Sequence, residues 1–262
     1  MGIIESKVAI VTGGGGGIGS AIVRRFAREG AKIVIADIDG ESAQPLSAEL
    51  SAQRVDAVPI VTDATKKQSV DDMVRAVLER WGRIDILVNV AGGAERIAVV
   101  DMTAAQWDRV VDMNLKSVFL CSQAILPAML KQKYGKIVNI SSIYGFTGNA
   151  TRSSYAAAKA GVAAFTKSLA LEVVKDGINV NAVAPGRVTT PRVRNRYSDE
   201  AWAAPARRKK SPRPCYFSLP MRTNTSPAKP SMLTAPGSIG RKRRSKVQQF
   251  QSPTLKDLTL NF

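Results

Sequence analysis

Short uninterrupted runs of β-branched and aliphatic residues recur along the first 190 residues of the chain. A strand that is buried on both faces has this pattern, since neither face can carry polar side chains. The pattern predicts parallel strands over residues 7–12, 32–37, 57–63, 84–89, 135–142 and 178–184.

Between these runs the apolar residues recur every three or four positions, which is the spacing of a helix with one buried face. In the stretch 18–29, Ile18, Ile22 and Phe26 share one face and Arg24 and Arg28 the other. Helices are also predicted over 66–81 and 104–131. The alternation of strand and helix predicts an α/β fold, a doubly wound parallel sheet of the Rossmann type with three layers in a single domain.

Glycine or polar residues stand where the predicted strands end. In open α/β sheets the carboxyl ends of the strands form the edge at which ligands bind. We therefore expect the binding site among the residues at five of these ends, which are Gly13, Asp37, Asp63, Asn89 and Ser142.

The run Thr12–Gly19 contains six glycines between the first strand and the first helix. Glycines at this place let backbone N–H groups approach a pyrophosphate at the positive end of the helix. A flexible turn is the alternative, but the position between strand and helix favours a dinucleotide. We expect Gly13, Gly17, Ile18 and Gly19 to bind the cofactor.

Asp37 ends the second strand, eighteen residues after Gly19. A carboxylate at this place accepts hydrogen bonds from an adenosine ribose and repels a 2′-phosphate. No Lys or Arg lies in the glycine loop or directly after Asp37. The sequence therefore favours NAD over NADP.

Tyr155 and Lys159 lie four residues apart, so they share one face of a helix. A lysine cation one turn away is expected to lower the pKa of the phenol, and Ser142 on a separate strand can hold a substrate oxygen against it. A Tyr and a Lys at this spacing also recur by chance, with a buried ring and a solvated amine. The assignment therefore depends on the surrounding motifs.

The composition limits the chemistry. The 262 residues include no histidine and two cysteines, Cys121 and Cys215, so histidine-based triads and common zinc sites are excluded and no metal site is expected. No apolar run of about 18 residues and no leader pattern is evident, which favours a soluble, cytoplasmic protein.

The net charge of +17 is concentrated in the last part of the chain. Residues 192–262 hold 16 of the 38 Lys and Arg but 3 of the 21 acidic residues, which leaves +4 for the first 191 residues. They also hold 8 of the 13 prolines. We expect a dinucleotide-binding catalytic domain over 1–191 and a basic, proline-rich and disordered tail over 192–262.

Taken together, these motifs resemble the short-chain dehydrogenase/reductase family over about residues 7–191. The resemblance rests on the glycine run, Asp37, Asp63, Asn89-Val90-Ala91-Gly92, Asn114, Ser142, Tyr155 with Lys159, and Pro185-Gly186 with Val188 and Thr190-Pro191.

The resemblance implies a role for each of these residues. Tyr155 would be the general acid/base, Ser142 would polarise the substrate oxygen, and Lys159 would bond the nicotinamide ribose. Asn114 would hold a water that links Lys159 to solvent. The implied cofactor contacts also include Asp63, Asn89, Val188 and Thr190. Val90 replaces a second Asn that is usual in the family, so we expect weaker support for that strand.

Two hypotheses of function follow. The first is an NAD-dependent oxidoreductase that moves a hydride between the cofactor and a secondary alcohol or ketone, in a homo-oligomer if the C-terminus is intact. The second is a non-catalytic dinucleotide-binding protein, or a scaffold whose basic tail binds nucleic acid through clusters such as 207–210 and 241–244. The complete set of Asn114, Ser142, Tyr155 and Lys159 favours the first, without membrane or nucleic-acid partners.

The segments that follow Pro191 in the family are absent here. A shifted reading frame has codons made of the third base of one residue's codon and the first two bases of the next residue's codon. Codons of this kind permit the missing family segments in their usual order. They permit Leu-Gly-Arg-Pro-Gly-Glu over 201–207, Val-Leu-Phe-Leu-Ala-Ser-Asp over 214–221, Tyr-Ile-Thr-Gly-Gln over 224–229 and Val-Asp-Gly over 232–235. The sequence thus predicts a frameshift between residues 187 and 202, with a genuine basic tail as the alternative.

Overall fold

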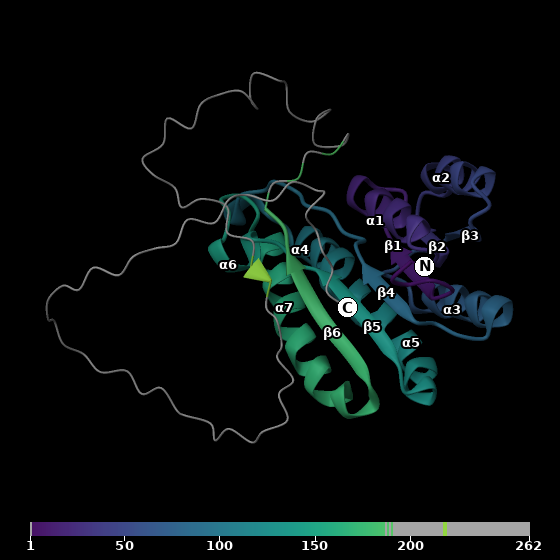
Figure 1. Cartoon of the computed structure of the whole chain (residues 1–262). Coiled ribbons are helices and arrows are strands. Elements are labelled where there is room, and N and C mark those ends of the chain that lie inside the picture. Colours follow the sequence, from purple (N-terminus) through teal and green to yellow (C-terminus); the bar gives the residue numbers. More distant parts are fainter. Residues whose placement is uncertain (1, 187, 189, 191–216, 219–262) are drawn as a thin grey trace, which may run out of the picture. The chain divides into compact units, whose positions relative to one another are not determined.

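The computed structural model describes residues 2–186, 188, 190, 217 and 218. Almost all of the described residues form one compact α/β unit (Figure 1). The expected disordered tail and the frameshifted segment lie outside the described residues, apart from the backbone of 217 and 218.

Six parallel strands form the body of the sheet (Figure 1). Their order is β3-β2-β1-β4-β5-β6, so the chain winds outward from β1 first on one side and then on the other. This topology confirms the predicted doubly wound parallel sheet. The strands are β1 (Val8–Thr12), β2 (Lys32–Asp37), β3 (Ala57–Val61), β4 (Ile86–Asn89), β5 (Gly135–Ile140) and β6 (Ile178–Ala184).

The helices pack on both faces of the sheet, as three layers require. One continuous core joins the strands to α3, α5 and α7, and in β2 it includes Val34 and Ala36. Ile33 and Ile35 alternate with these two residues, point to the other face and are also fully buried. The helices are α1 (Gly17–Arg28), α2 (Gly40–Ala52), α3 (Lys67–Trp81), α4 (Ala104–Val111), α5 (Ser117–Gln132), α6 (Tyr144–Thr147) and α7 (Ser153–Val173).

The helix predicted over 104–131 contains a π turn, Asp112–Lys116, between α4 and α5. By length and composition alone, the stretch Ala104–Gln132 could cross a membrane. Its side chains Val110, Ile125 and Met129 are instead fully buried within the α/β unit. We therefore interpret it as a core helix.

The outer edge of β6 has little pairing in the part of the chain that the structure describes. Its partner there is β7 (Phe217–Ser218), which runs antiparallel and pairs with Val183 and Ala184. No described strand pairs with residues 178–182 on that side. The backbone of this part of β6 is therefore an edge.

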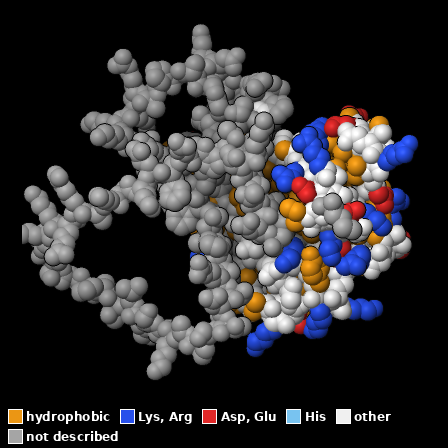
Figure 2. Space-filling model, viewed as in Figure 1, with side chains coloured by type: hydrophobic (Ala, Val, Ile, Leu, Met, Phe, Trp, Pro, Cys, Tyr) orange, Lys and Arg blue, Asp and Glu red, His pale blue; other side chains and the backbone are white. Residues whose placement is uncertain are grey.

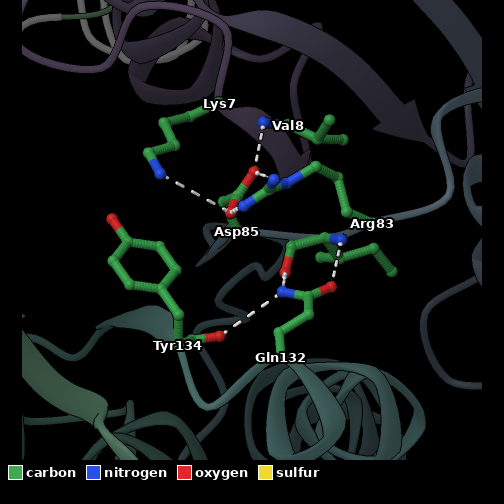
Figure 3. Close-up of polar contacts among 7 residues, drawn as sticks. Lys7, Val8, Arg83, Asp85, Gln132 and Tyr134 are labelled. Atoms are coloured by element: carbon green, nitrogen blue, oxygen red, sulfur yellow. Dashed lines mark hydrogen bonds and ion pairs between the residues drawn. The ribbon is translucent and has the colours of Figure 1, made fainter.

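At the amino end of the sheet, Asp85 joins the starts of β1 and β4 (Figure 3). Its fully buried carboxylate accepts hydrogen bonds from Val8 N at 2.9 Å and from Arg83 Nε at 2.9 Å and Nη2 at 2.6 Å. Lys7 Nζ lies 4.0 Å from it and 4.3 Å from the ring centre of Tyr134. These two cations compensate the buried charge.

The strand predicted to begin at Ile84 begins at Ile86. The amide of Ile84 donates to Gln132 Oε1 at 3.0 Å, and its carbonyl accepts from Gln132 Nε2 at 2.8 Å (Figure 3). A side chain thus satisfies both backbone groups of Ile84, which shortens the strand.

Charged side chains of both signs cover the face of the described unit seen in Figure 2, where Lys and Arg are interspersed with Asp and Glu. Several form surface ion pairs, such as Arg24 with Glu49 at 2.7 Å. Such pairs contribute little to stability.

Candidate active site

The carboxyl ends of the strands border a cleft of about 340 Å³. Seven of the residues predicted from the sequence line the cleft. They come from the chain that follows β5, from three helical segments and from the chain that follows β6: Ile18, Asn114, Ser142, Tyr155, Lys159, Val188 and Thr190. The other predicted residues do not line it: Gly13, Gly17, Gly19, Asp37, Asp63 and Asn89.

The glycine loop packs too closely for side chains. A Cβ on Gly19 would lie 2.1 Å from the carbonyl oxygen of Gly13, and a Cβ on Gly17 would lie 2.6 Å from Cβ of Thr190. Gly13 has φ +63°, a conformation that favours glycine. The loop therefore brings Thr190 against the start of α1.

The N-terminus of α1 suits a diphosphate. Its N-cap is Gly16, which has no side chain to accept hydrogen bonds, and its first turn holds no acidic residue. Backbone N–H groups and the positive end of the helix dipole are thus available to an anion. The residues present fit the dinucleotide that the glycine run predicts.

Asp37 lies at the end of β2 beside this loop. Its Oδ2 accepts a hydrogen bond from Gly15 N at 3.0 Å, and its Oδ1 accepts from Asp39 N at 3.2 Å. The carboxylate is thereby fixed next to the glycines, and the ribose contact expected of Asp37 stays a prediction. The residue that follows, Ile38, is exposed and uncharged.

Asp63 closes a turn after β3. Its Oδ1 accepts hydrogen bonds from Thr65 N at 2.9 Å and Oγ1 at 2.6 Å. The turn accounts for these contacts, and the cofactor contact expected of Asp63 stays a prediction.

Asn89 belongs to a buried polar chain that crosses the sheet. Its Nδ2 donates to Asn139 Oδ1 at 2.9 Å, and Asn139 Nδ2 donates to Thr166 Oγ1 at 2.9 Å. The side chain therefore links β4 to β5 and α7. The cofactor contact expected of Asn89 stays a prediction.

The strand exit at Val90 has a support that the sequence did not indicate. Thr12 Oγ1 accepts hydrogen bonds from Val90 N at 3.1 Å and from Ala91 N at 3.2 Å. The end of β1 thus holds the chain after β4 directly. The weaker support expected from Val90 in place of Asn stays a prediction.

Ser142, Tyr155 and Lys159 meet at the junction of β5 and α7. Ser142 follows β5 by two residues and is buried, and Tyr155 is half-buried in the first turn of α7. Lys159 Nζ lies 5.7 Å from the centre of the Tyr155 ring and donates to Ile140 O at 2.8 Å. The cluster thus places two hydroxyls and one amine in the cleft.

The expectation that the lysine lowers the pKa of the phenol is wrong for this arrangement. Burial is the largest effect and raises the pKa of Tyr155, while a hydrogen bond with Ser142 and the charge of Arg152 lower it. Burial also lowers the pKa of Lys159 to about 8. The amine lies beside the ring and bonds to a carbonyl, and its own charge is destabilised by burial.

Asn114 is buried in the π turn. A π turn leaves a carbonyl without its usual helical partner, and here Asn114 Nδ2 donates to Val110 O at 2.8 Å. The same amide group donates to Gly93 O at 2.7 Å and accepts from Gly93 N at 3.2 Å. Its side chain therefore holds the loop after β4 in place, and the water-binding role stays a prediction.

Two further residues shape the site without having been predicted. Ser141 Oγ donates to Lys159 O at 2.7 Å, which fixes α7 against the end of β5. Gly92 lies between two site residues, since a Cβ there would be 2.5 Å from Asn114 Oδ1 and 3.5 Å from Lys159 Nζ. The adjacent pair Ser141-Ser142 could have indicated Ser141. Adjacent residues at the end of a strand point to opposite faces of the sheet, so the two serines have different neighbours.

Among the residues that the structure describes, no group of three His, Cys, Asp or Glu comes together as metal ligands would. Within the described part of the chain, the charged residues that line the cleft are Arg96, Arg152 and Lys159, all of them basic.

Comparison with known proteins places this site in a family. A family model described as "short chain dehydrogenase" matches residues 7–201. The chain is 42% identical over 188 residues to 3-oxoacyl-[acyl-carrier-protein] reductase FabG of Thermotoga maritima, covering 72% of this chain and 76% of that protein. It is 43% identical over 188 residues to the (2S)-[(R)-hydroxy(phenyl)methyl]succinyl-CoA dehydrogenase subunit BbsD of Thauera aromatica, covering 72% and 75%.

Solved structures show the same fold. The crystal structure of gox2181 has a TM-score of 0.73 and 40% identity and covers 75% of this chain and 78% of that one. The structure of NAD⁺-bound xylitol dehydrogenase has a TM-score of 0.68 and 34% identity and covers 70% and 71%.

Proposed function

The chain belongs to the short chain dehydrogenase family, and from this premise we propose that it is an NAD-dependent oxidoreductase acting on a secondary alcohol or ketone. The observation that carries the proposal is the meeting of Ser142, Tyr155 and Lys159 in one cleft that also includes Ile18 from the glycine-rich helix start. When bound, the nicotinamide supplies or accepts the hydride.

Residues of the chain itself bind the substrate oxygen and transfer its proton. Ser142 donates a hydrogen bond to the substrate oxygen, and Tyr155 gives that oxygen a proton during reduction or takes it during oxidation. Lys159, held by Ile140 O at 2.8 Å beside the Tyr155 ring, would bond the nicotinamide ribose. Asn114 donates a hydrogen bond to Gly93 O and so fixes the loop after β4 where Gly93 lines the cleft.

A preference for NAD over NADP is supported by Asp37. Its carboxylate is fixed beside Gly15, and a 2′-phosphate at that place would meet a negative charge with no neighbouring cation at Ile38 or in the glycine loop. The NAD⁺-bound xylitol dehydrogenase among the similar structures is consistent with this choice.

We further propose a cytoplasmic protein that forms homo-oligomers if its C-terminus is intact, and a shift of reading frame between residues 187 and 202. The end of the family match at residue 201 supports the shift. A genuine basic tail remains the alternative.

The redox proposal is tested with the full-length chain, NADH and a panel of aliphatic, aromatic and carboxylate-bearing ketones, followed by absorbance at the wavelength of NADH. We expect turnover of at least one ketone, and replacement of Ser142 by Ala to reduce it roughly 100-fold. NADH binding without turnover of any ketone or alcohol would favour the non-catalytic alternative.

A further inference from the structure

Tyr144 is a second phenol at the cleft, and the proposed redox mechanism does not use it. It begins the short helix α6, two residues after Ser142, and is half-buried. Tyr144, Ser142 and Tyr155 all lie among the residues that line the cleft. A phenol at this place can contact a substrate that Ser142 and Tyr155 hold.

The backbone of α6 is bonded directly to Ser142. The amide of Tyr144 donates to Ser142 Oγ at 3.2 Å, and the amide of Gly145 donates to the carbonyl of Ser142 at 3.0 Å. The serine oxygen thus accepts a hydrogen bond from the backbone, and its own proton can go to Tyr155 or to a substrate oxygen. The position of Tyr144 is therefore tied to the hydroxyl that holds the substrate in the proposed mechanism.

Two further contacts fix α6 in place. The amide of Ile143 donates to the carbonyl of Pro185 at 3.1 Å, which joins the start of α6 to the chain after β6. Gly145 packs on α7, since a Cβ there would lie 2.8 Å from the carbonyl carbon of Lys159. The helix is thus held between the end of β6 and the start of α7.

The ring of Tyr144 lies near other residues of the cleft. The guanidinium carbon of Arg152 is 5.8 Å from the centre of the ring. Burial is the largest effect that raises the pKa of Tyr155, and the negative charge of a Tyr144 phenolate raises it further. Such an effect requires the two hydroxyl groups to lie near each other. Both phenols therefore occupy the same part of the cleft.

The hydroxyl of Tyr144 makes no hydrogen bond within the described part of the chain, although the amide of this residue does. By comparison, the hydroxyls of Ser141, Thr147 and Thr166 all donate to backbone carbonyls. A tyrosine hydroxyl that is partly withdrawn from water usually has a partner, because an unmade hydrogen bond costs free energy. This phenol is thus available to a ligand in the cleft.

From this arrangement we propose that Tyr144 determines specificity by binding a second oxygen of the substrate, and that the substrate is a hydroxy ketone or the corresponding diol. The proposal rests on the redox function proposed above, because it names the substrate class of the same cleft. A phenolic hydroxyl both donates and accepts a hydrogen bond, as a substrate hydroxyl does, so the two groups match.

The second oxygen should lie close to the reacting carbon. Ser142 holds the reacting oxygen in the proposed mechanism, and the amide of Tyr144 is bonded to the same serine. The two oxygens of the substrate are thus bound from adjoining parts of the chain. We therefore expect the hydroxyl on one of the first two carbons beside the carbonyl.

The test uses two pairs of ketones in which a hydroxyl replaces a methyl group. Hydroxyacetone is paired with butanone, and 4-hydroxy-2-butanone is paired with 2-pentanone. With NADH at pH 7 we expect the hydroxy ketone to have the higher kcat/KM in at least one pair. Tyr144→Phe keeps the ring and removes the hydroxyl, so it should lower the ratio of kcat/KM values in that pair by roughly 3- to 10-fold, as for one neutral hydrogen bond.

The ratio within a pair is chosen because any effect of Tyr144 on the proton transfer by Tyr155 changes both ketones alike. Tyr134→Phe, at the amino end of the sheet, is the matched control and should leave both ratios unchanged. Equal ratios in the wild type and the Tyr144→Phe variant for both pairs would overturn the proposal. A higher kcat/KM for the alkyl ketone in both pairs would overturn it as well.

A binding measurement separates this proposal from the redox function. Propane-1,2-diol and NADH are both reduced, so no hydride passes between them, and the change in NADH fluorescence gives the dissociation constant of the diol without turnover. Tyr144→Phe should weaken binding of the diol by roughly 3- to 10-fold and leave binding of 2-butanol and of NADH unchanged. This result supports the hydroxyl site even if no ketone is reduced. Reduction of ketones with unchanged ratios refutes this site and leaves the redox function standing.

Discussion

Tyr155 is the residue on which the proposed proton transfer depends. Replacement by Phe removes the phenolic oxygen and keeps the ring that packs beside Lys159. We expect turnover to fall by roughly 1,000-fold while the affinity for NADH changes by less than about 3-fold. The measurements are steady-state kinetics and quenching of NADH fluorescence.

Tyr134→Phe is the matched control, since Tyr134 lies at the amino end of the sheet beside Lys7. It should keep the wild-type rate. Residual activity of the Tyr155→Phe variant within about 10-fold of the wild type would exclude Tyr155 as the acid/base.

The buried amine of Lys159 lowers the free energy of unfolding at neutral pH. Its pKa falls from 10.5 to about 8 on folding, so the folded state disfavours the charged amine by on the order of 3 kcal/mol below pH 8. Between about pH 8 and 10.5 the folded protein binds fewer protons than the unfolded chain, and stability rises with pH. Lys159→Met should therefore raise the free energy of unfolding at pH 7 by about 1–2 kcal/mol, since loss of the bond to Ile140 offsets part of the gain.

Urea denaturation at pH 7 and pH 10 measures this effect. The difference in free energy of unfolding between the Lys159→Met variant and the wild type should be smaller at pH 10 than at pH 7. Lys175→Met, at an exposed position, provides the control and should show no such change. A variant that is less stable than the wild type at pH 7 would contradict the burial argument.

Asp37 is expected to select the cofactor. Asp37→Ala removes a ribose acceptor and the charge that opposes a 2′-phosphate, so the ratio of kcat/KM with NADH to that with NADPH should fall by about 10-fold or more. The prediction is measured with one substrate and both cofactors. A wild-type preference for NADPH would refute it.

At this scale the sequence identified the residues with a chemical motif, and it missed those that act through tertiary contacts. Seven predicted residues line the cleft because the carboxyl ends of parallel strands meet at one edge. Ser141 was missed because its partner is the backbone of Lys159, eighteen residues away. The pKa of Tyr155 was predicted in the wrong direction because burial of the ring cannot be read from a spacing of four residues.

At the scale of elements, the clamp formed by Asp85 holds the starts of two adjacent strands. Asp85→Ala leaves Val8 N without its partner and Arg83 without its ion pair. Loss of one partner of a buried charged pair should lower the free energy of unfolding by about 2–4 kcal/mol, measured by urea denaturation. Activity at 20 °C should remain within about 3-fold, because the cleft lies at the other end of the strands.

Asp56→Ala is the comparison for the clamp. Asp56 pairs with Arg80 and Trp81 at the surface, where both charged groups stay partly solvated. We expect a loss below about 1 kcal/mol there. Equal losses in free energy of unfolding for Asp85→Ala and Asp56→Ala would mean that the buried clamp stabilises the protein no more than a surface pair does.

The elements were predicted well where periodicity alone determines them, as in α3 and β2. The π turn in the stretch 104–131 was not predicted, because the apolar spacing of α4 and α5 continues through it. The late start of β4 was also missed, since it depends on the side chain of Gln132 from a distant helix. Such boundaries are set by tertiary hydrogen bonds.

At the scale of the whole molecule, the open question is the chain after β6. If the frame shifts between residues 187 and 202, the natural product replaces the basic tail by a segment that supplies the missing parallel strand. Resequencing the gene across codons 187–205 tests this, and we expect one inserted or deleted base. A clean single frame, or a peptide covering residues 231–241 in the natural protein, would refute the shift.

The predicted frameshift also affects how the chain associates with other copies of itself. Residues 178–182 of β6 have no strand partner on one side within the described part of the chain. An unpaired apolar edge can pair with another chain. The chain with the basic tail should therefore aggregate at lower concentration than a frame-corrected version, as measured by light scattering.

The clamp at Asp85 and the cleft lie at opposite ends of the same strands, and this separation bears on how the protein can change over generations. Substitutions around Arg96 and Arg152 can be sampled while the buried carboxylate continues to hold the strand starts. A library randomised at the cleft should thus contain a large share of folded members with new substrate preferences. In a background that lacks Asp85, fewer members of the same library should remain folded, because each new side chain would meet a smaller reserve of stability.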